Sequence, residues 1–566
     1  MATRELSLLR SNAGLPAALA AAVRVAGLLA AVLCSAMGLS AEVRAQAPPG
    51  FKTYENKLSE LTFCYSSFYK EVPLPPTEQL LVAKFVLKRT PRELKKVSER
   101  IVKAVNPQLL VFAFDDASGP VTGGGASKGG GRKGGKAAGG GAATVRELME
   151  GRSRVTSWEQ FSKRLGWQLE ARKTRVAGLE LFAFAPRPVG RGMTATGYLA
   201  RRRIGSRVIG AYAWSLDPFD KKLRKIVEQM GKSLAVATSD ANSDLVERRI
   251  DRIYRKSQLA GIDWRKKVRR GLARGWKAVD TDNYLIVHHS KNGSLIRRIA
   301  RDVEAMRTFY MKLFPPTGKV DRVCVLRLCA TKQEYHQYGG PPNTGGYWHP
   351  GNEELVLFDY SYTQRTLSEA EKKRMGGRRM TSEDSMLVMR HEAFHQYIFY
   401  AIGEFSPHDW FNEGYGDYFS GAVIHPNTGR VRKMAPSSWR IDHAKRMCGE
   451  GKGFLPLRKI LSAERAQFYN RSRIGDYYAG AWSFVYFLQQ SEVATKHPQW
   501  SQLLTIYFDA VKQGYAAEIA DVEGAPNLKH KQVAGFTARR RALETMLEGL
   551  DVEELEKAWR QYVADL

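Results

Sequence analysis

A His-Glu-x-x-His pattern at residues 391–395 constrains the fold of this chain more than any other feature. A helix is predicted around it, because Thr381 and Asp384 have the spacing of a capping box and Gly403 ends a stripe of apolar residues. On a helix, histidines four positions apart lie one turn apart, where both imidazoles can bind one metal ion. Glu392 is the next residue round the helix, so its carboxylate can reach a water molecule on that ion.

A second motif downstream offers the further donor that such a site needs. Catalytic zinc typically has three protein ligands and keeps one position for water, so two histidines require a third donor. Glu413 follows His395 by eighteen residues, which lets the first helix end, the chain reverse and a second helix present a carboxylate. Asp417 lies four residues further on the same helical face, where it can accept the free ring N–H of a ligating histidine. The predicted metal ligands are therefore His391, His395 and Glu413, with Asp417 behind them.

The two motifs together resemble those of a known clan. His-Glu-x-x-His followed by Asn-Glu-x-x-x-Asp at residues 412–417 is similar to the gluzincins, the peptidase MA-like clan that holds thermolysin and the aminopeptidase N group. The wider context, about residues 281–566, resembles a bacterial family of predicted exported gluzincin domains of undefined function. The resemblance implies a zinc metallopeptidase, an endopeptidase acting on a peptide or protein substrate. It implies Zn²⁺ bound by His391, His395 and Glu413, Glu392 as general base and acid, and Asp417 as the residue that orients a ligand.

Residues 477–481, Tyr-Tyr-Ala-Gly-Ala, resemble the aminopeptidase segment in which a tyrosine three positions before a glycine hydrogen-bonds the tetrahedral oxyanion. Matching on Gly480 selects Tyr477 for this role, although Tyr478 is adjacent and the aromatic-rich helix could be plain core. The Gly-x-Met-Glu-Asn segment that holds the substrate amino terminus in aminopeptidases is absent from the sequence. The strand predicted at Glu354–Phe358 is expected to be an edge strand that binds extended substrate by main-chain pairing.

Other interpretations of the same residues remain open. Two core histidines beside a surface acid give the same five-residue pattern, and Glu413 with Asp417 also fits an ordinary amphipathic helix. A catalytically inactive zinc-peptidase scaffold could bind anionic envelope or extracellular polymers through its basic surface, but the intact Glu392 argues against a retired site. A purely structural zinc site usually has four protein ligands, and the sequence offers no clear fourth donor.

The first 47 residues have the pattern of a signal peptide. Arg4, Arg10 and Arg24 precede an apolar run at Val25–Leu39, and an Ala-x-Ala sequence follows at residues 45–47. The apolar run is shorter than the ~20 residues that a membrane-spanning helix needs. Export to the periplasm, cell envelope or extracellular space is therefore expected, with no transmembrane helix left after cleavage.

The positive net charge indicates which classes of molecule this protein is expected to bind. Lys and Arg number 88 against 57 Asp and Glu, a formal net charge of +31, and residues 201–280 alone hold 21 basic and 9 acidic side chains. Such an excess favours anionic polymers at the cell envelope, although a solvated basic face needs no partner. Nucleic acid is not expected, because no zinc-finger, RNP-type or basic-zipper pattern accompanies the charge and the protein is predicted to be exported.

At 566 residues the chain predicts two or three domains of the α+β class. The last domain is expected to hold a small mixed sheet, the active-site helix at its junction with the sheet, and a mostly helical C-terminal part. Strands are predicted at Tyr284–His289, Val320–Leu328 and Glu354–Phe358 and helices at Leu295–Phe314 and Lys332–Tyr338. The predicted divisions are an accessory α+β domain at 48–118 and 144–235, a Gly-rich flexible linker or loop at 119–143, a basic helical connector at 236–280, and the gluzincin-like domain at 281–566.

Four cysteines remain after the leader: Cys64, Cys324, Cys329 and Cys448. In an oxidising compartment they could pair, and isolated buried thiols are the equal alternative. Cys324 and Cys329 fall in one predicted strand at an odd separation, so their side chains point to opposite faces and a bridge between them is not expected.

Overall fold

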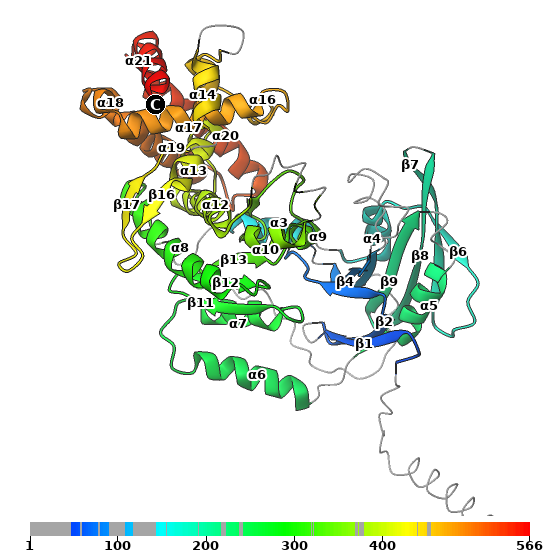
Figure 1. Ribbon diagram of the computed structural model, residues 1–566. Helices are drawn as coiled ribbons and strands as arrows, with labels where there is room; N and C mark the ends of the chain where they lie inside the picture. The colour runs from blue at the N-terminus through cyan, green and yellow to red at the C-terminus, as the bar shows by residue number, and fades with distance from the viewer. Residues whose placement is uncertain are drawn as a thin grey trace, which may run out of the picture. The chain divides into compact units, whose positions relative to one another are not determined.

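The architecture is α+β, as predicted (Figure 1). The described residues form a seven-stranded and a five-stranded sheet, two smaller sheets and a helical C-terminal part. Residues 50–566 group into one unit. The predicted signal peptide, except Ala47, and nearly all of the predicted Gly-rich linker lie outside the described residues. The computed structural model describes residues 47–566 with gaps at 57–58, 77, 79, 90–107, 117–142, 154, 191, 217–221, 237–240, 319, 321, 368, 370–371, 373–378, 438–439 and 450–453.

The upstream region is built on a seven-stranded antiparallel sheet. Strand β5 (Gln108–Asp115) of this sheet is apolar along most of its length, because helices cover both faces of the sheet there. Leu109 and Val111 pack with helix α5, whereas Leu110 and Phe112 pack with helix α4. A smaller sheet, in the order β1-β2-β10, lies beside α5. The other elements here are β1 (Phe51–Asn56), β2 (Leu61–Ser66), β3 (Tyr69–Val72), β4 (Leu81–Leu87), α3 (Val145–Ser153), α4 (Trp158–Leu165), β6 (Leu169–Arg172), β7 (Glu180–Gly190), β8 (Met193–Ile204), β9 (Arg207–Leu216), α5 (Leu223–Ser233) and β10 (Ala235–Val236).

The basic connector contains two helices, α6 (Ala241–Tyr254) and α7 (Ile262–Arg270). Arg265 of α7 is fully buried, and its guanidinium donates to Asp280 and to the main-chain carbonyls of residues 260, 281, 282 and 284. Strand β11 (Lys277–Asp280) already belongs to the second sheet. Helix α7 and strand β11 share a hydrophobic core with the second sheet, so the region built on that sheet begins before residue 281.

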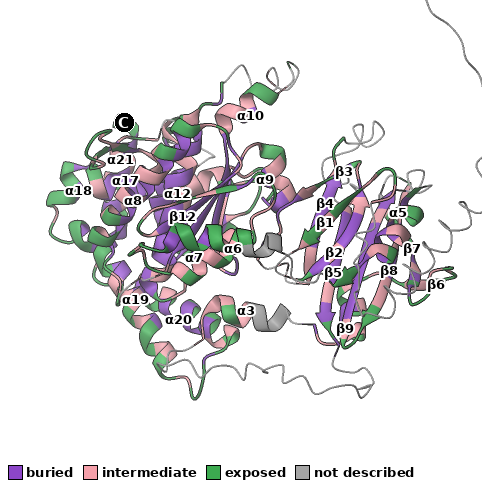
Figure 2. Ribbon diagram, turned by 90° about the horizontal axis from the view of Figure 1, so that it is seen from below, coloured by how far each residue is buried: buried purple, intermediate pink, exposed green. Residues whose placement is uncertain are grey.

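The second sheet has five strands in the order β11-β12-β13-β15-β14. Helices α8 and α12 cover one face, and α7 and α9 cover the other (Figure 2). The prediction that Glu354–Phe358 (β15) is an edge strand is wrong, because β15 pairs in parallel with β13 and antiparallel with β14, which is the edge. The elements of this part are β12 (Tyr284–His288), α8 (Gly293–Leu313), β13 (Cys324–Cys329), α9 (Lys332–Tyr338), β14 (Gly346–His349), β15 and α10 (Tyr360–Thr366).

After α10, the regular structure of the described residues is helical, apart from a short hairpin formed by β16 and β17. The core of these helices is rich in fully buried aromatic side chains and is continuous with the face of the second sheet that α12 covers. The elements are α12 (Ser382–Ile402), α13 (Asp409–Ser420), β16 (Ala422–Ile424), β17 (Val431–Met434), α14 (Ile441–Cys448), α15 (Leu457–Leu461), α16 (Arg465–Phe468), α17 (Ile474–Gln490), α18 (Glu492–Lys496), η3 (Trp500–Gln502), α19 (Leu503–Ala520), α20 (Leu528–Leu547) and α21 (Val552–Asp565).

Two further predictions concern cysteines and the membrane. Cys64, Cys324, Cys329 and Cys448 are all buried and free, so of the two alternatives the structure has isolated thiols. Burial raises the pKa of the Cys324 and Cys448 thiols to about 12, which leaves them protonated and unreactive. Within the part of the chain that the structure describes, none of the helices has the length and apolar character that a membrane span requires.

A candidate metal centre between two helices

Helix α12 presents the His-Glu-x-x-His motif from a tightly fixed position. It begins with the predicted capping box, in which the Thr381 hydroxyl accepts from the backbone and the Asp384 carboxylate accepts from the Thr381 N–H. It ends at Gly403, whose φ of 107° suits a residue without a side chain. Most of α12 is buried between the sheet and the C-terminal helices, so the rings of His391 and His395 are held in a packed interior.

The three predicted ligands converge. His391 and His395 of α12 and Glu413 of α13 place one ligand atom each within 4.8 Å of one another. His391 Nε2 lies 3.1 Å and His395 Nε2 3.5 Å from the same oxygen, Glu413 Oε2. All three residues are largely buried, and the two helices lie side by side (Figure 1). The arrangement is a candidate metal-binding triad of two imidazole nitrogens and one carboxylate oxygen.

Both imidazoles are oriented from behind by acceptors on α13. His391 Nδ1 lies 3.2 Å from Asp417 Oδ1, the contact that the sequence predicted. His395 Nδ1 donates to Asn412 Oδ1 at 2.9 Å. With each Nδ1 next to one of these acceptors, each Nε2, which faces Glu413 Oε2, is the ring nitrogen that can bind a metal ion. No role was predicted for Asn412, although its place directly before Glu413 in the Asn-Glu pair was a usable signal.

Two glycines let α13 approach its neighbours. A Cβ on Gly416 would lie 2.7 to 2.9 Å from three atoms of the His391 ring. A Cβ on Gly414 would lie 2.7 Å from the main-chain oxygen of Ala481 in α17. Real Cβ atoms do not come this close to other heavy atoms, so the sequence Glu-Gly-Tyr-Gly-Asp is what allows α13 to pack against α12 and α17 at once.

The charges in the triad stabilise one another. Burial alone would raise the pKa of Glu413, but the two imidazoles outweigh burial and hold its pKa well below the usual range. Burial would lower the pKa of His391, but hydrogen bonds with Asp417 and Glu413 outweigh it and raise that pKa. Glu413 is therefore an ionised carboxylate, the form in which it can bind a cation.

Glu392 faces the edge strand of the second sheet. Its carboxylate accepts the main-chain N–H of Trp348 in β14, and a Cβ on Gly346 would lie 3.0 Å from its Cγ. Burial raises the pKa of Glu392, while the charges of His391 and His395 and the Trp348 N–H oppose that shift. The predicted base thus lies between the triad and the main chain of β14.

Two tyrosines complete the surroundings of the triad. The Tyr469 hydroxyl donates to Glu413 Oε1 at 2.5 Å, which fixes the oxygen that does not face the histidines. Tyr478 is buried beside the carboxylates of Glu413, Asp417 and Glu392, and these raise its pKa in addition to burial. The Tyr477 ring packs against Phe468. Of the adjacent tyrosines on α17, the structure brings Tyr478 to the triad.

Arg440 is a further residue that the sequence did not single out. Its Nε donates to Asp417 Oδ2 at 2.6 Å, and its guanidinium lies 4.8 Å from the centroid of the Tyr478 ring. It stands 23 residues beyond Asp417, outside any motif, so only the folded chain reveals the contact.

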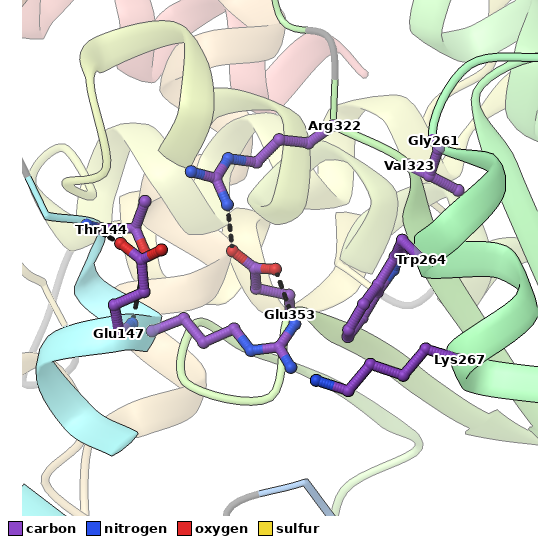
Figure 3. Close-up of a pocket in the computed structure, with 9 residues that line it drawn as sticks. Thr144, Glu147, Gly261, Trp264, Lys267, Arg322, Val323 and Glu353 are labelled. Atoms are coloured by element: carbon purple, nitrogen blue, oxygen red, sulfur yellow. Dashed lines mark hydrogen bonds and ion pairs between the residues drawn. The ribbon is translucent and has the colours of Figure 1, made fainter. Parts of the chain in front are cut away.

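A network of ion pairs connects this region to the upstream chain. Arg322 lies 2.8 Å from Glu353, directly before β15, and 3.3 Å from Glu404, directly after the C-cap of α12. Arg146 of α3 reaches Glu353 at 3.1 Å, and the Val145 N–H donates to Glu404 at 2.7 Å. Arg146, Arg322 and Glu353 line a cavity of about 370 Å³. Figure 3 shows Arg322 and Glu353 beside this cavity, with Trp264 and Lys267 of α7 also at its border.

The acids of this network have an uncommon backbone. Glu353 and Glu404 have φ values of 51° and 74°, in the left-handed region that non-glycine residues seldom adopt. Such a backbone conformation costs free energy, so contacts with the rest of the protein must stabilise it. The ion pairs of the Glu353 and Glu404 carboxylates are such contacts. The network therefore fixes the β14–β15 hairpin relative to the end of α12.

Comparison with known proteins gives one family match. Residues 385–497, which include the triad, match a family described as "Protein of unknown function (DUF1570)". No curated protein matches this chain. Solved structures are similar at low levels, and two of them have TM-scores of 0.18 each. Cyanobacterial PsbP (CyanoP) from Synechocystis sp. PCC 6803 is 9% identical, over 33% of this chain and 92% of that one. A protein from Bacteroides thetaiotaomicron VPI-5482 is 7% identical, over 62% of this chain and 80% of that one.

Proposed function

We propose that this chain is an exported zinc metallopeptidase of the gluzincin type that hydrolyses internal bonds of peptides or proteins. The observation that carries the proposal is the convergence of His391, His395 and Glu413 with Glu392 beside them. Export rests on the leader pattern of residues 1–47.

The residues present fit a catalytic zinc ion. Two neutral imidazoles and one ionised carboxylate are a donor set that zinc accepts, and three donors leave a fourth position for solvent or substrate. The ring N–H groups are held by Asp417 and Asn412, as the outer partners of ligating histidines usually are. The Tyr469 hydroxyl donates to Oε1 of Glu413, and Oε2 is the oxygen that faces the histidines.

Each surrounding residue has a role in peptide hydrolysis. A zinc ion held by His391, His395 and Glu413 would supply a Lewis acid for the scissile carbonyl and for a water molecule. Glu392 takes the proton of that water and gives it to the leaving amine. The Tyr478 hydroxyl, which lies beside Glu413, can donate to the oxygen that becomes negatively charged. Strand β14, at the sheet edge beside Glu392, can align an extended peptide by main-chain pairing.

Two variants test the proposal. Purified protein should contain about one zinc per chain and cleave casein. Glu392→Gln should keep the zinc and lose at least ~1000-fold in activity, because the base is removed but the ligands remain. His395→Ala should lose both zinc and activity. Metal content by mass spectrometry and release of casein fragments are the measurements.

The outcomes separate the alternatives. Full casein cleavage by the Glu392→Gln variant would contradict the mechanism, and wild-type protein that binds no zinc would contradict the site. A wild-type protein that holds zinc but cleaves neither casein nor short peptides would instead favour the inactive scaffold that binds anionic polymers.

A further inference from the structure

Helix α6 has an exposed face on which apolar and basic side chains alternate. Much of α6 is exposed (Figure 2). Leu245 is 60% exposed, Ile253 47% and Val246 39%, which are high values for aliphatic side chains. Basic residues follow the same helical spacing and are also exposed. We name as the α6 face the residues Leu245, Val246, Arg249, Arg252, Ile253 and Lys256.

The opposite side of α6 is fixed to the protein. Ile250 and Tyr254 are buried, and the Tyr254 hydroxyl donates to Asp280 at 2.9 Å. Glu247 pairs with Arg270 of α7 at 2.8 Å, and Asp251 pairs with Lys266 of α7 at 2.6 Å. The acids at 247 and 251 are thus neutralised by α7, and α6 cannot turn its apolar residues inward without breaking these contacts.

The remaining charge on α6 is positive. Arg249, Arg252 and Lys256 lie on the α6 face, and Arg248 and Arg255 flank it. Five cations are therefore on this face or beside it. All five of these side chains are exposed. Five exposed cations close together on one helix favour an anionic partner.

We propose that the α6 face binds the surface of an anionic phospholipid membrane. Transfer of three aliphatic side chains from water into the headgroup boundary lowers the free energy of the system. The arginines and the lysine contact the lipid phosphates there. A soluble polyanion would use the charges but offer nothing to Leu245, Val246 and Ile253. The proposal is independent of the metal centre and of peptide hydrolysis.

Sedimentation with vesicles tests the proposal. The full-length mature protein should co-sediment with vesicles of phosphatidylglycerol and phosphatidylcholine, but not with phosphatidylcholine alone, and added salt should weaken binding. The Arg249→Gln/Arg252→Gln variant should bind roughly 30-fold more weakly, because each cation near such a surface is worth about fivefold. The Leu245→Ser/Ile253→Ser variant should also bind at least ~10-fold more weakly, because two aliphatic side chains no longer enter the boundary.

Helix α20 supplies a matched control. Val533 and Phe536 are each 54% exposed there, so Val533→Ser/Phe536→Ser removes comparable apolar area from another surface and should leave binding unchanged. Loss of binding in this control, or wild-type binding by either α6 variant, overturns the proposal. If the Leu245→Ser/Ile253→Ser variant binds vesicles as tightly as the wild type, charge alone operates and a soluble polyanion is the better partner. Circular dichroism of each variant verifies that the fold is intact.

Discussion

At the scale of single residues, Asp417 is the point at which several contacts meet. One of its oxygens lies 3.2 Å from His391 Nδ1 and the other accepts from Arg440 at 2.6 Å. Burial would raise the pKa of Asp417, but the charges of Arg440 and His391 outweigh burial and lower it. Asp417 is therefore ionised and fixed in place, and it holds the His391 ring by a charged hydrogen bond.

Replacing Arg440 should weaken metal binding without unfolding the protein. In Arg440→Met, Asp417 loses its second partner and the His391 ring is less well held, so we expect about 10-fold weaker zinc binding. Competition with a zinc chelator measures the affinity. Arg440→Lys, which keeps the charge, should recover part of it. An affinity equal to that of the wild type in Arg440→Met would show that Arg440 does not act through Asp417.

His408 should make stability depend on pH. It is buried before α13, where its Nδ1 lies 2.8 Å from the Tyr507 hydroxyl, and burial with the charge of Arg539 lowers its pKa to about 3. The unfolded chain binds a proton at this residue below about pH 6.5 and the folded chain does not, so stability falls as the pH falls from 6.5 toward 3. The expected slope from this residue is about 1.4 kcal/mol per pH unit.

Urea unfolding between pH 5 and 6.5 measures this slope. The variant His408→Gln keeps a polar group near Tyr507 but cannot titrate, so its stability should change less with pH than that of the wild type. Equal slopes in the two proteins would mean that His408 is protonated in the folded state at these pH values.

At the scale of elements, the spacing between helices depends on the glycines of α13. Gly416→Ala would place a methyl group within 2.9 Å of the His391 ring, so the ring or the helix must move. We expect zinc binding to fall by at least ~10-fold while most of the fold remains. Zinc content and a thermal melt measure the two effects. Gly293→Ala in α8, where the nearest atom is a flexible arginine nitrogen at 3.5 Å, is the control and should retain zinc.

Local signals in the sequence predicted several elements well. The capping box and Gly403 located α12, and β15 and α9 begin and end at the predicted residues, because the signals for these elements lie within them. The order of strands could not be predicted in the same way. Strand β14 has only four residues and begins with glycine, so no alternation identified it, and β15 was taken for the edge. Pairing between strands depends on residues far apart in the chain.

The candidate site was predicted to different depths. The triad and Asp417 follow from two helical motifs whose spacing fixes the faces of the helices. Tyr477 and Tyr478 differ by about 100° around α17, and a short match to a family segment does not determine which one turns inward. Tyr469 and Arg440 reach the site from separate segments, and only tertiary packing brings them there.

At the scale of the whole molecule, Arg322 joins the buried Glu353 to the partly buried Glu404. Arg322→Met would leave Glu353 and Glu404 with fewer partners in strained backbone positions, so we expect a loss of about 2 to 3 kcal/mol in the free energy of unfolding. Urea unfolding measures the loss. The control is Arg541→Met, whose exposed pair with Glu518 should contribute less than about 1 kcal/mol. Equal losses in both variants would show that the Arg322 network contributes no more than a surface pair.

The contacts of α3 limit how independently the two halves of the chain can vary. Arg146 neutralises a carboxylate on the hairpin that carries Trp348 to Glu392, and Met149 lies against Gly351 of the same hairpin. A shortened protein that began at residue 281 would keep every predicted ligand but would leave Glu353 with one cation fewer. Exchange of the upstream half, by recombination or by engineering, must therefore retain a cation at position 146 or alter residue 353 with it.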